Sequence, residues 1–202
     1  RNTIRFFTPE MNAKLQQNKE ILTDLAESLI KNHFELYYQP LFTIDDRALV
    51  GAEALIRWNH PEKGMIPPDK FISIAEKSGL INELGDWVLA QACREIKAFT
   101  KAGILPIKVA INISPVQFKR KDFVQHILGI LAQHDVSPNF VELEITEGAV
   151  MDDVDQAIAT MQALHDSEFQ LAMDDFGTGY SSFSYLKRYQ NQKLKIERNH
   201  VR

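Results

Sequence analysis

The sequence predicts an α/β fold in which an antiparallel hairpin is followed by parallel βα units. Two apolar, strand-like runs over residues 34–42 and 48–58 flank Asp45 and Asp46, a pattern typical of antiparallel strands joined by a tight turn. After the hairpin, helical and strand-like segments alternate along the chain, as they do in parallel βα units. The 202 residues, 45% of them hydrophobic, are sufficient for one domain with a sizeable core.

The first 31 residues are predicted to be an appendage, and residues 32–202 to form the domain itself. Residues 3–7 read as a short strand that has no partner nearby in the sequence. From residue 11 to residue 31, apolar side chains recur at helical spacing and predict one amphipathic linker helix. Two roles are open for this helix: packing on the domain that follows, or transmitting a signal from an upstream module. Its apolar residues are Leu15, Ile21, Leu22, Leu25 and Leu29.

The segments after the hairpin are predicted from their start and stop signals. Residues 61–68 hold three prolines and Gly64, so we expect a loop there. Asp69 stands where the N-cap of a helix to residue 77 would be, and Gly103 lies just past a longer helix. Further helices are expected over 81–100, 121–133, 152–165 and 180–187, and strands over 107–113, 141–146, 169–175 and 193–197.

The composition narrows the class of protein. A net charge of −4 argues against broad binding to nucleic-acid backbones, which requires a basic face. No apolar run approaches the roughly 20 residues of a transmembrane helix, and the charged start of the chain lacks a secretory signal. Cys93 is the only cysteine, which excludes an internal disulfide. We therefore expect a soluble, cytoplasmic domain, although its parent chain could be anchored elsewhere.

Polar residues recur in or at the end of the apolar strands. A charged or amide group is costly to bury there without a partner, so a single one would be read as a satisfied buried group. Five at corresponding positions indicate a shared site, because the carboxyl ends of parallel barrel strands meet at one mouth, where polar residues are usually catalytic. The five are Glu53, Asn112, Glu144, Asp174 and Lys195.

The run that begins at residue 169 ends in two adjacent carboxylates, Asp174 and Asp175, and then in a turn. Successive strand residues point to opposite faces, so the two carboxylates share one direction only where the strand is ending. Gly177 and Gly179 permit that turn. Carboxylates with an amide oxygen, and no His or Cys cluster, suit Mg²⁺ or Mn²⁺. Two adjacent acids could bridge a metal pair about 4 Å apart, as in phosphodiester cleavage.

Three other chemistries are not favoured by the sequence. The six histidines show no zinc-binding spacing. Ser114 and Ser181 do not lie in a Gly-x-Ser-x-Gly elbow, so a nucleophilic triad is not favoured. The Gly-rich stretch 177–179 lacks the Lys-Ser or Lys-Thr of a P-loop.

The motifs together resemble the EAL domain of bacterial cyclic-di-GMP phosphodiesterases. The resemblance covers about residues 34–202, with the motifs in family order. It implies a TIM-like (β/α) barrel with an antiparallel first strand, and a two-metal Mg²⁺ or Mn²⁺ site. It also implies hydrolysis of one phosphodiester bond of cyclic di-GMP to linear pGpG. The matching motifs are Glu53-Ala-Leu55, Asn112-Ile-Ser114, Glu144-Ile-Thr-Glu147, Asp174-Asp-Phe-Gly-Thr-Gly-Tyr-Ser-Ser182 and Lys195-Ile-Glu197.

The same resemblance assigns roles to single residues. Glu53, Asp175 and Lys195 are the implied catalytic residues, with Lys195 holding the attacking water and Asp175 reaching the second metal. Glu147 is similar to the glutamate that anchors the loop 176–182. Arg57 and Gln39 resemble residues that contact the dinucleotide, and their alternatives are a surface salt bridge and a strand-end hydrogen bond. The implied ligands of the first metal are Glu53, Asn112, Glu144 and Asp174.

The sequence departs from the family pattern in two places. Lys-Ile-Asp of the family reads Lys-Ile-Glu here, with Glu197 one methylene longer, and the sequence reaches Arg202 before the downstream Glu-Gly-Val motif. We therefore expect a barrel that lacks its last one or two βα units, and little activity from these residues alone. Residues 1–12 are similar to the end of a GGDEF domain, which implies a tandem GGDEF–EAL parent. The loop 176–182 is similar to the family loop that couples substrate, metal and dimerisation, which implies a homodimer. A receptor that binds cyclic di-GMP without cutting it, or a protein-binding scaffold, remains an alternative.

Overall fold

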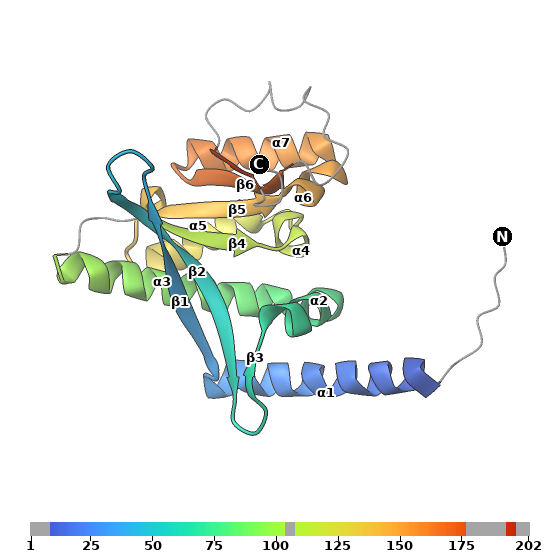
Figure 1. Ribbon diagram of the computed structural model, residues 1–202. Helices are drawn as coiled ribbons and strands as arrows, with labels where there is room; N and C mark the ends of the chain where they lie inside the picture. The colour runs from blue at the N-terminus through green and yellow to red at the C-terminus, as the bar shows by residue number, and fades with distance from the viewer. Residues whose placement is uncertain (1–8, 104–107, 177–192, 197–202) are drawn as a thin grey trace.

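The computed structural model describes residues 9–103, 108–176 and 193–196, and its centre is one mixed β-sheet (Figure 1). The strands follow the order β1-β2-β4-β5-β6-β7, and β3 pairs with β2 outside this path. The strands are β1 (Phe34–Phe42), β2 (Leu49–His60), β3 (Gly64–Ile66), β4 (Lys108–Ile113), β5 (Val141–Thr146), β6 (Gln170–Phe176) and β7 (Lys193–Ile196).

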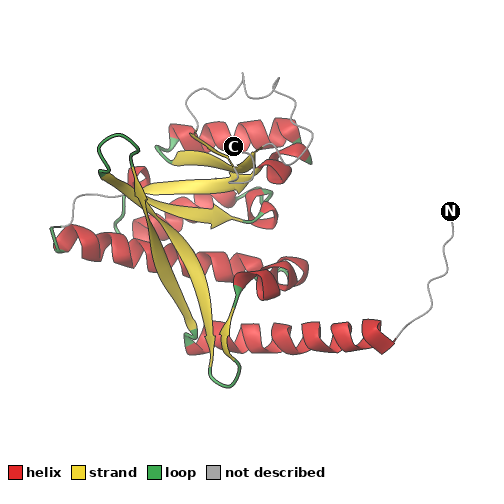
Figure 2. Ribbon diagram, in the orientation of Figure 1, coloured by secondary structure: helices red, strands yellow, loops and turns green. Residues whose placement is uncertain are grey.

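Helices alternate with these strands, as the sequence predicts. Figure 2 shows the long strands of the hairpin running from the loop between them to the helix α1 at the other end. No helix within the described ranges is both long and apolar enough to cross a membrane. The helices are α1 (Pro9–Lys31), α2 (Pro68–Ser78), α3 (Ile81–Lys101), α4 (Pro115–Phe118), α5 (Phe123–Gln133), η1 (Pro138–Phe140), α6 (Glu147–Met151) and α7 (Val154–Asp166).

The pairing confirms a hairpin followed by parallel βα units. β1 and β2 are antiparallel, whereas β2–β4, β4–β5, β5–β6 and β6–β7 are all parallel. Among the described residues, β1 and β7 are the two ends of the path. The described strands therefore form an incomplete, TIM-like barrel with an antiparallel first strand.

Several local predictions were wrong. The predicted loop contains β3, because Gly64 adopts a positive φ of 68° and lets the chain fold back onto β2. Asp69 is not an N-cap: Pro67 has that position, and Pro68 begins the helix, where its missing N–H costs no hydrogen bond. The short helices α4 and α6 were not predicted. The predicted strand 3–7 and helix 180–187 lie outside the described residues.

The larger core lies on one face of the sheet, which α3, α5 and α7 cover. Strand side chains alternate between faces, so every second residue of the parallel strands points into this core. Ile111, Leu143 and Met173 come from three neighbouring strands, and Leu89 and Met161 from the helices that cover them. The remaining strand residues are thereby directed to the opposite face, which carries the polar residues.

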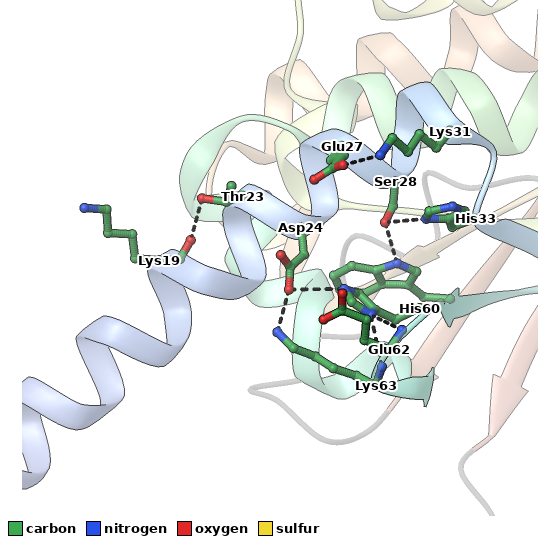
Figure 3. Close-up of polar contacts among 11 residues, drawn as sticks. Lys19, Thr23, Asp24, Glu27, Ser28, Lys31, His33, His60, Glu62 and Lys63 are labelled. Carbon is green, nitrogen blue, oxygen red and sulfur yellow. Dashed lines mark hydrogen bonds and ion pairs between the residues drawn. The ribbon is translucent and has the colours of Figure 1, made fainter.

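A smaller core joins the C-terminal half of α1 to the hairpin. Leu25 and Trp58 are both 0% exposed, and they pack with Phe34 and Phe71. The indole Nε1–H of Trp58 donates to the hydroxyl of Ser28 at 2.9 Å, which satisfies a buried donor. Figure 3 shows Ser28 also facing His33, whose Nδ1 lies 3.3 Å from the hydroxyl. Of the two roles left open for this helix, the structure shows packing on the domain.

A polar cluster on the outer side of this junction ties α1 to the turn between β2 and β3 (Figure 3). Asp24 of α1 accepts a hydrogen bond from Lys63 and lies 3.3 Å from His60 Nε2. His60 Nδ1 accepts the backbone N–H groups of Glu62 and Lys63 at 3.1 Å each, so Nε2 carries the proton that faces Asp24. The hydrogen bond from Lys63 lowers the pKa of Asp24 below its usual value, against the opposing effect of burial.

We expect Asp24→Asn to lower the free energy of unfolding at neutral pH. Because the pKa of Asp24 is lower in the folded state than in the unfolded state, its charged form stabilises the fold above the unfolded-state pKa. This contribution is lost as the pH falls through the carboxyl range, below about pH 4. Urea unfolding of wild type and variant at several pH values measures the difference, which should shrink toward acid. A difference that is constant from pH 7 to pH 3 would contradict the ion-pair account.

Candidate functional site

The polar face of the sheet brings together side chains from five strands. Glu53 of β2 lies opposite Gln39 on β1 and opposite Ala110 on β4. Asn112, two residues beyond Ala110, lies opposite Glu144 on β5. Asp174 on β6 lies opposite Thr146, two residues beyond Glu144. Since residues opposite each other share a face and the side-chain period is two, these side chains all project from the same face.

Glu53 and Asn112 are joined directly. The amide Nδ2 of Asn112 donates to Glu53 Oε1 at 2.9 Å, across neighbouring parallel strands. The bond uses the amide nitrogen of Asn112, so the amide oxygen Oδ1 is the atom left to bind a cation. It also fixes the Glu53 carboxylate beside that oxygen. Two residues 59 positions apart in the sequence thus form the first half of the oxygen-rich site.

Glu144 and Asp174 extend this set along the sheet. Glu144 is only 1% exposed, on a strand where the buried apolar residues Val141, Leu143 and Ile145 alternate with Glu142, Glu144 and Thr146. Asp174 is half-buried on the next strand, two residues before that strand ends at Phe176. Carboxylate and amide oxygens on one face are the ligands that Mg²⁺ and Mn²⁺ prefer, and a buried carboxylate is costly unless it is compensated. The donor set therefore fits a hard divalent cation.

The described side chains do not by themselves complete a metal centre. Among the residues that the structure describes, no three His, Cys, Asp or Glu side chains lie close enough together to hold a metal ion. Asn112, one of the four expected ligands of the first metal, is an amide and so does not count among these four residue types. The structure thus aligns the expected ligands on one face, and the assignment of a metal to them is a proposal.

Asp175 and Lys195 lie on the described strands β6 and β7, but their side chains are outside the described part of the structure. The pairing of these strands is irregular between Met173 and Phe176, where the two aspartates lie. Such an irregularity interrupts the strict alternation of faces, as the adjacent acids require if both are to serve one site. β6 continues through Phe176, one residue beyond the acids, and the loop 177–182 is outside the described residues.

A pocket of about 320 Å³ adjoins the site between β2, β4, α2 and α3. Arg57 and Asn112 line it, together with Glu76 of α2 and Ser114. The hydroxyl of Ser114 donates to Glu76 Oε1 at 2.7 Å and accepts the N–H of Val116, so Ser114 caps α4 and is not arranged as a nucleophile. Glu76 was not among the predicted residues, because its contact with the end of β4 depends on how α2 packs and leaves no pattern in the sequence.

The remaining predicted residues are placed as follows. Gln39 is exposed on β1, directly opposite Glu53. Arg57 lies four residues after Glu53 on the same face of β2, and its Nη1 donates to the carbonyl oxygen of Ile56 at 2.9 Å. Among the described residues it forms no salt bridge. Glu147 is buried as the first residue of α6, and the loop that it is expected to anchor is not described.

Comparison with known proteins identifies the fold and the family. A family model described as "EAL domain" matches residues 22–202. The bifunctional diguanylate cyclase/cyclic di-GMP phosphodiesterase MucR of Pseudomonas aeruginosa is 38% identical over 201 residues, which are 100% of this chain and 29% of MucR. The cyclic di-GMP phosphodiesterase NbdA of the same species is 37% identical over 201 residues, covering 100% of this chain and 26% of NbdA.

A solved structure agrees with these relatives. The PaMucR phosphodiesterase in complex with c-di-GMP superposes with a TM-score of 0.85 at 38% identity, over 89% of this chain and 73% of that chain. The chain spans less than a third of the length of the two curated relatives. The resemblance carried by the motifs is thereby confirmed, and the chain belongs to the EAL domain family.

Proposed function

We propose that this domain hydrolyses cyclic di-GMP to linear pGpG in a metal-dependent reaction. The observation that carries the proposal is the oxygen-rich row on one sheet face, where Asn112 is hydrogen-bonded to Glu53 and lies opposite Glu144. Receptors that have lost hydrolysis would not need this set, which the chain retains together with both Asp174 and Asp175. The likeness to the MucR phosphodiesterase supports the same substrate.

Each residue then has a distinct task. Glu53, Asn112, Glu144 and Asp174 would hold one Mg²⁺ or Mn²⁺, and Asp175 would reach a second. Such a pair, when bound, supplies Lewis-acid activation of water and of the phosphodiester. Lys195, as an ammonium with three donors, would orient the attacking water but cannot take its proton. Arg57 and Gln39 would bind the dinucleotide.

The wider setting of the domain is part of the proposal. Residues 1–31 would be the tail of an upstream GGDEF-like domain with a linker helix, and residues 32–202 the EAL domain. The family match begins at residue 22, inside α1, and α1 packs on the domain through Leu25. We further propose a homodimer in the cytoplasm, acting in bacterial second-messenger signalling and biofilm control.

The test is to incubate the full-length product of the gene that encodes this chain with cyclic di-GMP, and to follow linear pGpG by chromatography. Product formation that requires Mg²⁺ or Mn²⁺, and stops with a chelator, is the expected result. Saturable binding of cyclic di-GMP without product, in either metal, would contradict hydrolysis and support the receptor instead. Absence of both binding and product would overturn the proposed ligand.

A further inference from the structure

Arg57 and Tyr37 contact each other on the polar face of the hairpin. The Cζ atom of Arg57 lies 5.4 Å from the centroid of the Tyr37 ring. In the register Arg57 is opposite Glu35 and Tyr37 is opposite Leu55, so the two side chains are diagonal neighbours on adjacent strands, within reach of each other. A guanidinium within about 6 Å of an aromatic centroid is attracted to the ring face. The contact is therefore a cation–π interaction beside the pocket that Arg57 lines.

Tyr37 has no evident structural task on this face. It is 47% exposed and belongs to neither apolar core of the described chain. Its neighbour Tyr38 points to the other face, where its ring packs edge-on against Phe99 with centroids 5.7 Å apart. The two tyrosines are thus divided by the alternation of the strand: one packs on the helices, and the other faces Arg57.

We infer that Tyr37 is a positioning residue for Arg57. A flexible arginine side chain loses rotamer entropy when it is fixed by a ligand, so holding the side chain in place beforehand reduces the entropic cost of binding. The Tyr37 ring and the Ile56 carbonyl oxygen both contact the guanidinium and together restrain it. The inference rests on the proposed function, since the ligand that benefits is an anionic dinucleotide.

Tyr37→Leu and Tyr37→Phe form the matched pair for the kinetic test, because phenylalanine keeps the ring face and leucine removes it. In the full-length gene product, Tyr37→Leu should raise KM for cyclic di-GMP about two- to fivefold, with little change in kcat. Tyr37→Phe should remain near wild type. In an Arg57→Met background, Tyr37→Leu should have no further effect on KM. Equal KM for the two single variants would overturn the inference.

A second measurement needs no ligand and so separates the two proposals. Urea unfolding of wild type, Tyr37→Leu, Arg57→Met and the double variant forms a double-mutant cycle. The two substitutions should be non-additive, by about two- to fivefold in the unfolding equilibrium constant. Additive effects would show that the ring does not hold Arg57, even if cyclic di-GMP is hydrolysed. If the effects are non-additive but the protein does not bind cyclic di-GMP, the contact between Tyr37 and Arg57 is confirmed and only the proposed ligand is wrong.

Discussion

Replacing Glu144 by glutamine is expected to remove most of the metal-dependent hydrolysis by the full-length gene product. The substitution keeps the shape of a side chain that is 1% exposed, but it replaces a charged oxygen by a neutral amide. Loss of a residue that merely supports a metal ligand typically costs about 10- to 100-fold in metal affinity or activity. Loss of a ligand carboxylate should cost at least as much, so we expect activity to fall by about 100-fold or more.

Glu142→Gln is the matched control, because Glu142 precedes Glu144 by two residues on the same face of β5 and is also buried, at 6% exposure. Its neighbours in the register are Ala110 and Gln170, neither of which is a carboxylate. Glu142→Gln should therefore retain the affinity for Mn²⁺, measured by titration calorimetry, and most of the activity. Equal losses of Mn²⁺ affinity and activity in Glu144→Gln and Glu142→Gln would show that the polar face of the sheet acts through its total charge. An active Glu144→Gln variant would remove Glu144 from the ligand set.

Much of the fold could be predicted because the signals for it are local. The hairpin was visible in two apolar runs around Asp45 and Asp46, and the parallel strands in the alternation that follows. The strand β3 was not, because three residues paired with β2 have no periodicity of their own and depend on the fold-back at Gly64. The helix α4, which Ser114 caps, was not predicted either, because its four residues are too few to show a helical periodicity.

The polar row was predictable for a different physical reason. A charged residue in an apolar strand stands out against its neighbours, which is how Glu53 and Glu144 could be found. Side-chain contacts between segments far apart in the sequence leave no such mark. Ser28 reaches Trp58 across 30 residues, and Glu76 reaches Ser114 across 38, so both depend on how helices pack. Tyr37 is adjacent to a chemically similar Tyr38, and only the register of β1 and β2 separates their roles.

Leu25→Asp is expected to have the largest effect on stability. Leu25 is 0% exposed and packs where α1 meets Trp58, Phe71 and Ile81, so the variant would place a carboxylate in an apolar core. Removing a buried leucine side chain costs about 2–5 kcal/mol, and an unpaired buried charge adds to this cost. We therefore expect the free energy of unfolding to fall by at least about 3 kcal/mol, a large part of the roughly 5–15 kcal/mol of a typical domain.

Leu15→Asp is the control on the same helix, because Leu15 is 56% exposed, and its substitution should change stability by less than about 0.5 kcal/mol. Leu22 is half-buried, so Leu22→Asp should lower the free energy of unfolding by an intermediate amount. Urea unfolding followed by circular dichroism measures all three, and limited proteolysis reports whether α1 has left the domain. Since no predicted metal ligand lies on α1, the folded fraction of Leu25→Asp should bind Mn²⁺ as wild type does. Equal stability of Leu15→Asp and Leu25→Asp would show that α1 does not rest on the hairpin, and would return its role to transmission of a signal alone.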